Sequence, residues 1–114
     1  MSKSFNDITK HVSKNMAKLR RDIPETSKAF TGLALAASDD GVLDKKTKEL
    51  IALALAVGSR CDACIGFHTK ALLALGATRE EVAETLGVCI YMGGGPSMMY
   101  AAEAIAAFDE FSAA

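Results

Sequence analysis

The sequence predicts an all-α fold, a single-domain bundle of about six helices. Half of the 114 residues are apolar and many of these are alanine, which favours closely packed helices over a sheet. Apolar side chains recur at spacings of three and four residues, and no segment alternates polar and apolar residues as a strand does. The length suits one compact domain, so we expect residues 1–114 to form a single unit.

Periodicity and proline predict the first two helices. Large apolar residues from Phe5 to Leu19 recur at helical spacing and predict a helix over residues 4–20. Pro24 favours the first turn of a helix, so a second helix is predicted over residues 24–37. The turn sequence SDDG follows it.

Capping residues bound the next two helices. Asp44 is a good N-cap for a third helix, in which every residue over 50–57 is apolar, so we expect this half to be buried on all sides. Gly58 and the following serine are expected to break it. A fourth helix is predicted over 61–75, with Gly76 as the glycine that commonly follows a helix.

The last two helices are marked by a capping box and by glycines. Thr78 and Glu81 have the spacing of a capping box, which predicts a fifth helix to about residue 92. Three glycines then precede Pro96, which opens a sixth helix over 96–111. We interpret the glycines as a tight connection, because no strand precedes them and the lysine of a phosphate-binding loop is missing.

Composition excludes several classes of function. The net charge is −1 and the basic residues form no dense patch, so no nucleic-acid partner is indicated. The N-terminus lacks an apolar signal segment, and glycines interrupt the longest apolar stretch, over 86–102. We therefore expect a cytoplasmic protein with no membrane partner. An alanine-rich core buries little area, which favours a homo-oligomer.

Three of the five cysteine and histidine residues fall within eight positions: Cys61, Cys64 and His68. On a helix, Cys61 and Cys64 lie ~60° apart and Cys61 and His68 only ~20° apart, so all three share one face. Free N–H groups at a helix start and a neighbouring imidazole both favour a thiolate. Cytoplasmic cysteines stay reduced unless their chemistry is in use.

Glu49 is the expected fourth member of this group. It stands ~12 Å of helix rise before the end of the third helix, and His68 stands ~10 Å into the fourth. If the two helices fold back antiparallel, Glu49 and His68 come abreast. Because Glu49 directly precedes the apolar run, we expect its carboxylate to be desolvated and able to exchange protons near neutral pH. The alternative is a solvated pair with Lys45.

These four groups suit thiol redox chemistry. Two thiols three residues apart on a helix start can close to a disulfide with little backbone motion. The histidine takes a proton from one thiol, and the glutamate orients the ring or passes the proton on. The thiolate attacks an electrophilic oxygen or sulfur, and the second thiol resolves the product as a disulfide.

The pattern E-x11-C-x2-C-x3-H, formed by Glu49, Cys61, Cys64 and His68, resembles that of the alkylhydroperoxidase D family, within the carboxymuconolactone decarboxylase-like superfamily. The stretch GATREEV and the glycine-rich break before the last helix are also similar, and the resemblance covers about residues 25–110. It implies an all-α fold with the CxxC at the start of a central helix, commonly in a trimer or hexamer.

The resemblance also implies a thiol-dependent peroxidase without a bound cofactor. Cys64 would react with a hydroperoxide, Cys61 would resolve it, and His68 with Glu49 would relay protons. A lipoyl- or thioredoxin-type dithiol would supply the reducing equivalents, which can pass to a peroxiredoxin. Ala63 stands where the best-studied relatives have a second histidine. This departure adds weight to general thiol–disulfide exchange.

Two other classes of function stay open. Cys61, Cys64 and His68 could hold zinc with Glu49 or water as the fourth ligand, although the chain has no second ligand pair. The chain could also be a non-catalytic assembly module. Lactone decarboxylation is disfavoured, because the decarboxylase branch of the superfamily lacks the cysteine pair. Cys89 lies mid-helix among apolar residues, so we expect it to be packed and buried.

Overall fold

The computed structural model describes residues 2–114. Within them the chain forms six helices and no strand, which confirms the all-α prediction. The helices are α1 (Phe5–Asp22), α2 (Pro24–Ser38), α3 (Lys45–Gly58), α4 (Asp62–Ala74), α5 (Arg79–Gly93) and α6 (Gly95–Ser112). Each end lies within about two residues of its predicted position, the usual spread of helix boundaries. None of these helices is long and apolar enough to cross a membrane.

The capping signals of the sequence determine where the helices begin. The Asp44 side chain accepts a hydrogen bond from Thr47 N at 2.7 Å, as an N-cap of α3. Thr78 and Glu81 form the reciprocal capping box of α5. A single residue, Gly94 with φ of 72°, connects α5 to α6, so the glycine-rich stretch is a tight helix–helix connection.

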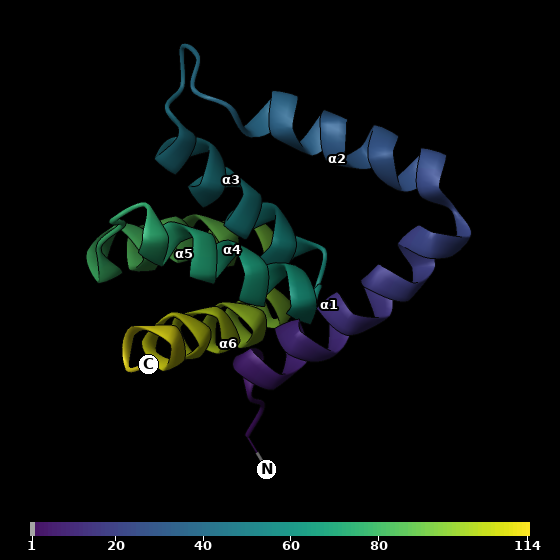
Figure 1. Cartoon of the computed structure of the whole chain (residues 1–114). Coiled ribbons are helices and arrows are strands. Elements are labelled where there is room, and N and C mark those ends of the chain that lie inside the picture. The colour runs from purple at the N-terminus through teal and green to yellow at the C-terminus, as the bar shows by residue number, and fades with distance from the viewer. Residues whose placement is uncertain (1) are drawn as a thin grey trace.

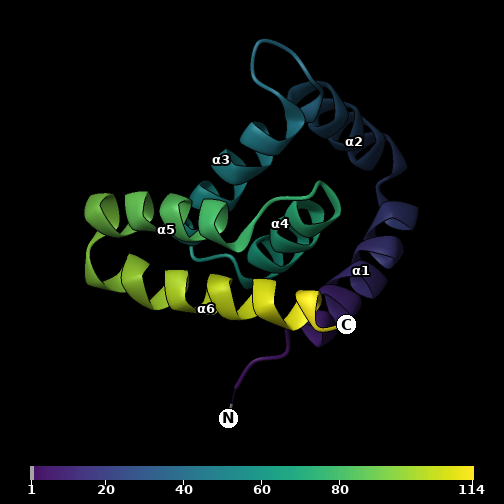
Figure 2. The same ribbon diagram turned by 90° about the vertical axis from the view of Figure 1, so that its left-hand side faces the viewer.

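The core lies between α3, α4, α5 and α6, and the first half of α1 closes it (Figure 1). Figure 2 shows α5 and α6 lying side by side along one side of the bundle. The largest fully buried side chains come from several helices: Phe5, Leu53, Val57, Ile65, Thr69, Leu72 and Val82. Because α1, α3 and α6 all pack against α4, the helix that carries the CxxC is held on three sides.

The start of α1 is anchored by α6. The Glu110 carboxylate accepts hydrogen bonds from Phe5 N and Asn6 N, each at 2.9 Å. Beyond its first half, α1 leaves the bundle (Figure 1), so Leu19 is half-exposed although it continues the periodic pattern from Phe5. The period therefore predicts the helix but not how far its apolar face is covered.

Helix α2 stands apart from the bundle and has no buried residue (Figure 1). Its apolar side chains Phe30, Leu33 and Leu35 are 69%, 64% and 65% exposed. The part of the chain that the structure describes therefore leaves this apolar face of α2 without a partner, although most of the stability of a helix this short comes from packing.

The expectation that residues 50–57 are buried on all sides is wrong. Leu53, Ala56 and Val57 are buried, but Ile51 and Leu55 are 46% and 66% exposed. The reason is that α2 does not close over this side of α3, and pockets lie there instead.

Candidate functional site

Cys61 and Cys64 form a disulfide at the start of α4, with their Cα atoms 5.2 Å apart. Cys61 is the N-cap of α4, one position before the first turn, and its Sγ accepts a hydrogen bond from Cys64 N at 3.2 Å. A sulfur in this position faces the free N–H groups and the positive end of the helix dipole, which favour its thiolate form after reduction.

The turn between α3 and α4 positions this disulfide. Arg60 N donates to Val57 O, and Cys61 N donates to Ala56 O, each at 3.1 Å. These two bonds form a Schellman motif, in which Arg60 takes the left-handed conformation with φ of 57°. The sequence assigned the break to Gly58 and its neighbour, but Gly58 is the last residue of α3, and Arg60 is the residue that reverses the chain.

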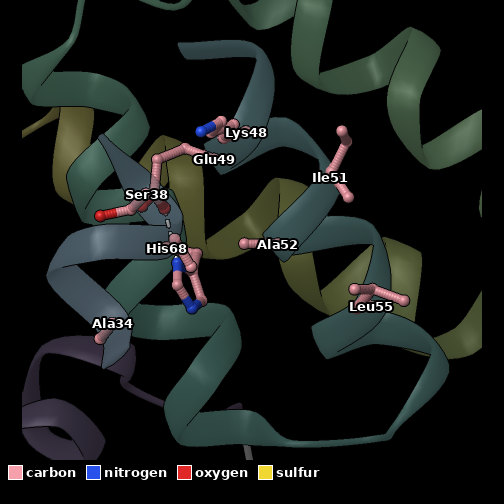
Figure 3. A pocket seen from close by; sticks show the side chains of 9 residues that line it. Ala34, Ser38, Lys48, Glu49, Ile51, Ala52, Leu55 and His68 are labelled. Carbon is pink, nitrogen blue, oxygen red and sulfur yellow. Dashed lines mark hydrogen bonds and ion pairs between the residues drawn. The ribbon is translucent and has the colours of Figure 1, made fainter. Parts of the chain in front are cut away.

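Glu49 and His68 come abreast across this turn, as the lengths of the two helices predicted. His68 Nδ1 donates to Glu49 Oε2 at 2.6 Å, and Figure 3 shows the two side chains reaching toward each other from α3 and α4. The Glu49 side chain is 12% exposed and that of His68 is 35% exposed. Because the carboxylate can only accept, Nδ1 carries a proton, and Nε2 is the nitrogen left to exchange one.

The imidazole of His68 borders two pockets. One, of about 290 Å³, is lined by both disulfide cysteines, His68, and the α3 residues Ala52 and Leu55. We call it the disulfide pocket. The other, of about 390 Å³, contains Glu49 and lies between α3 and the end of α2 (Figure 3). His68 therefore lines the disulfide pocket while its Nδ1 is bonded to a carboxylate that is largely sheltered from water.

The sequence profile of the carboxymuconolactone decarboxylase family matches residues 24–107. The chain belongs to this family. The superfamily expected from the cysteine motif is thereby confirmed.

Similar proteins cover most of the chain. A protein of Cupriavidus necator is 46% identical over 102 residues, 90% of both chains. A protein described as protein 4 in the cox locus of Paracoccus denitrificans is 36% identical over 107 residues, which cover 88% of this chain and 96% of that protein.

Solved structures share the fold. The apo form of a carboxymuconolactone decarboxylase family protein from Legionella pneumophila has 60% identity and a TM-score of 0.93, covering 95% of this chain and 96% of its own. A Thermotoga maritima member has 33% identity and a TM-score of 0.72, covering 77% of this chain and 91% of its own. That Thermotoga maritima protein is described as 'possibly involved in antioxidative response'.

The structure of this carboxymuconolactone decarboxylase family member thus brings all four predicted site residues to one place, while their chemical roles stay predictions. Glu49 pairs with His68 and not with Lys45. In the disulfide form, no three His, Cys, Asp or Glu side chains among residues 2–114 are arranged to hold a metal ion.

Cys89 lies outside the disulfide pocket, in the interior of α5. It is 8% exposed, which confirms the predicted burial, and desolvation raises the pKa of its thiol. Its Sγ is directed at Thr85 O, 3.5 Å away. A neutral, buried thiol is a poor nucleophile, so Cys89 is a packing residue in this protein.

Sequence reasoning missed the walls of the two pockets. Leu55 was expected in the core, and Ala34 and Ser38 of α2 carried no signal. Their place beside the site follows from the path of the connection over residues 39–44, which brings the end of α2 near α3. No local pattern in the sequence encodes that path.

Proposed function

We propose that this protein is a thiol-dependent peroxidase and disulfide oxidoreductase of the alkylhydroperoxidase D type. The observation that carries the proposal is that the Cys61–Cys64 disulfide and His68 line one pocket at the start of α4. The Nδ1 atom of this histidine is bonded to the sheltered Glu49 carboxylate. A dithiol, a proton acceptor and a group that orients it are the parts that this chemistry needs.

The peroxide step begins with the reduced form. His68 Nε2 accepts the proton of the Cys64 thiol, and Glu49 stabilises the imidazolium that forms. The Cys64 thiolate attacks the terminal oxygen of a hydroperoxide, and the O–O bond breaks. The imidazolium returns its proton to the leaving alkoxide, which departs as an alcohol and leaves a sulfenic acid on Cys64.

The resolving step closes the disulfide. The Cys61 sulfur attacks the sulfenic sulfur of Cys64, forming the S–S bond and releasing water. An external dithiol then restores both thiols by two successive exchanges and leaves as a cyclic disulfide, so two electrons pass from dithiol to peroxide. The division of roles between Cys64 and Cys61 follows the family resemblance. The reductant is of lipoyl or thioredoxin type, and a peroxiredoxin can receive the same equivalents.

A second candidate is general thiol–disulfide exchange without a peroxide step. Ala63 favours it, because this position cannot supply the second imidazole of the best-studied relatives. The same dithiol and the same relay would then act on a disulfide substrate, and the reductant would be unchanged.

We further propose that the protein acts as a homo-oligomer, a trimer or hexamer. The unburied apolar face of α2 supports this, because a second copy of the chain would cover Phe30, Leu33 and Leu35. Sedimentation velocity would measure the assembly, and a monomer at micromolar concentration would contradict it.

The test of the activity is peroxide consumption with dihydrolipoamide, thioredoxin and glutathione supplied in turn. We expect turnover, and a mass 2 Da below the dithiol form after one equivalent of peroxide, as a closed disulfide requires. Cys64→Ser should abolish turnover, and Cys61→Ser should accumulate a sulfenic acid on Cys64. Cys89→Ala is the matched control and should keep full activity, since Cys89 lies outside the disulfide pocket.

Several results would contradict the proposal. Equal residual activity in the two serine variants would remove the assigned roles. Disulfide exchange without peroxide consumption would favour the second candidate. Stoichiometric zinc in the reduced protein, with no thiol turnover, would favour a metal site instead. His68→Ala should raise the pH needed for thiol reactivity, and an unchanged pH profile would exclude His68 from the relay.

A further inference from the structure

The residue that follows Cys61 places a negative charge at the start of α4. Asp62 is the first residue of this helix, and its side chain is 35% exposed. The positive end of the helix dipole favours an acid at this position, as it favours a thiolate on Cys61. The carboxylate itself disfavours a thiolate beside it, because like charges oppose ionisation. The helix start therefore promotes ionisation of the reduced cysteines, while Asp62 acts against it.

Lys3 neutralises this negative charge. Its Nζ donates to Asp62 Oδ1 at 3.1 Å and lies 3.1 Å from Oδ2, so both carboxylate oxygens face the ammonium. The contact joins the segment before α1 to the CxxC, although the two residues are 59 positions apart in the chain. The hydrogen bond to Asp62 raises the pKa of Lys3 above its ordinary value, so the lysine stays charged over the pH range in which thiols ionise.

Helix α6 holds Lys3 in this place. The Lys3 Nζ lies 5.3 Å from the centre of the Tyr100 ring, a distance typical of a cation–π contact. The negative charge of Glu103, three residues further along α6, also favours the ammonium. A lysine on a free surface samples many rotamers, whereas this one contacts α4 and α6 at once. Its charge is therefore kept beside the carboxylate.

Other charged groups do not replace Lys3 at this carboxylate. Among residues 2–114, no second cation forms an ion pair with Asp62. Helix α1 presents the uncharged side chains of Phe5 and Thr9 to α4. Arg60 belongs to the α3–α4 turn, but it lines a different pocket from the cysteines. The other titratable groups near this helix start in the described chain are Glu49 of α3, His68 of α4, and Tyr100 and Glu103 of α6.

We propose that Lys3 is a positioning residue of the CxxC, which neutralises Asp62 and thereby favours the reactive thiolate form of the reduced cysteines. Lys3 acts on the sulfurs through Asp62, whose carboxylate it contacts. The effect on thiol ionisation stands on these contacts alone. Its consequence for turnover rests on the proposed function, because peroxide attack and disulfide exchange both use a thiolate.

Ultraviolet absorbance of the thiolate, measured against pH in the reduced protein, tests the effect on ionisation. Cys89→Ala should be present throughout, so that only the two site thiols report. Lys3→Met keeps an apolar stem beside Tyr100 and removes the charge. It should raise the pH of half-ionisation by about half a pH unit, the effect of one uncompensated charge about 7 Å from a sulfur near a protein surface. Below that pH the thiolate fraction should fall about threefold.

Variants of Asp62 test whether Lys3 acts through this carboxylate. Asp62→Asn should lower the pH of half-ionisation, because the ammonium then has no partner to neutralise it. The double variant Lys3→Met with Asp62→Asn should titrate as the natural protein does, since neither charge remains. Lys3→Arg should keep the natural value, and salt at about 1 M should remove most of the differences by screening. An unchanged titration of Lys3→Met would overturn the proposal, as would a double variant that keeps the Lys3→Met shift.

Lys46→Met is the matched control. Lys46 pairs with Glu81 at 2.8 Å, and these two side chains are as exposed as those of Lys3 and Asp62. Lys46 lies about 18 Å of helix rise from the end of α3, so its replacement should leave thiol ionisation unchanged. Exposed ion pairs contribute little to stability, so both lysine variants should unfold near the natural Tm. A lower Tm for Lys3→Met with an unmoved titration would show that Lys3 only anchors the chain, and would overturn the proposal.

Turnover of cumene hydroperoxide with dihydrolipoamide separates this inference from the proposed function. Lys3→Met should be slower by up to about threefold below the pH of half-ionisation, and equal to the natural protein at high pH, where the thiol is fully ionised. The shifted titration without any thiol turnover would contradict the proposed function and leave the role of Lys3 in thiol ionisation. Turnover with an unshifted titration would overturn that role and leave the proposed function.

Discussion

Gly66 marks the closest approach of α1 to the helix that carries the CxxC. A Cβ at this position would lie 2.5 Å from Thr9 Cγ2 and 3.6 Å from Phe5 Cδ1. Thr9 cannot easily move away, because it is 3% exposed and its Oγ1 donates to Phe5 O at 2.9 Å. Gly66→Ala should gain about 0.5–1 kcal/mol from helix propensity. The overlap should cost about 1–3 kcal/mol, so the net loss of stability is about 1 kcal/mol.

Thermal and urea unfolding followed by circular dichroism would measure this change, which corresponds to a fall of roughly 4 °C in Tm. Gly87→Ala is the matched control. Gly87 lies exposed on α5 with nothing within 4 Å of an added Cβ, so alanine there should stabilise the protein by about 0.5–1 kcal/mol. The two substitutions are chemically identical, and the reasoning requires that they have opposite signs.

Thr9→Ser provides the decisive comparison. Serine keeps the hydroxyl that bonds to Phe5 O but removes Cγ2, the atom in conflict with the new methyl group. In the Thr9→Ser background, Gly66→Ala should stabilise by about 0.5–1 kcal/mol, giving a coupling of about 2 kcal/mol between the two sites. Stabilisation by Gly66→Ala alone, or a coupling near zero, would refute the packing argument.

Two further predictions concern titratable groups. Hydrogen bonds from the backbone N–H of Asn6, and then of Phe5, lower the pKa of Glu110 below 4.5, although desolvation acts in the opposite direction. The ionised Glu110 carboxylate therefore stabilises the fold above pH 4.5. This stabilisation is lost as the pH falls through the pKa that Glu110 has in the folded protein. Glu110→Gln should therefore lower the urea midpoint at pH 7 and have less effect at pH 3; an equal effect at both would contradict this linkage. Burial raises the pKa of Cys89, so iodoacetamide should modify this thiol far more slowly at pH 8 in the folded protein than in urea, and equal rates would show that it is not buried.

The sequence predicted the helices well because their ends are encoded locally. Asp44 and Thr78 each bond the N–H three residues later, which needs no tertiary contact. The meeting of Glu49 and His68 was also predictable, since it depends only on two helix lengths and an antiparallel turn. Distances counted along a helix are reliable for this reason.

What the sequence could not predict depends on the path of the chain between helices. Leu55 and Phe30 are apolar and lie in helices, yet both are exposed, because α2 stands apart from the bundle and does not close over this side of α3 (Figure 1). Arg60 is a similar case. Glycine at 58 appeared to be the turn residue, and only the backbone dihedral shows that the left-handed position falls two residues later. Residue preferences do not mark an arginine as a left-handed residue, so this position is recognised from its strained backbone dihedral angle and not from a sequence pattern.

The redox change that we propose at this site involves two side chains. The Cα atoms of Cys61 and Cys64 are 5.2 Å apart at the start of α4. In the disulfide form, Cys61 Sγ accepts a hydrogen bond from Cys64 N, and α1, α3 and α6 hold the helix on three sides. We therefore expect that opening and closing the disulfide needs little movement of the backbone. Under the proposed function, a substrate would reach the sulfurs through the disulfide pocket, which Leu55 and His68 line. If the proposed function holds, the side chains around that pocket, more than the cysteine pair itself, would determine which hydroperoxide or dithiol reacts.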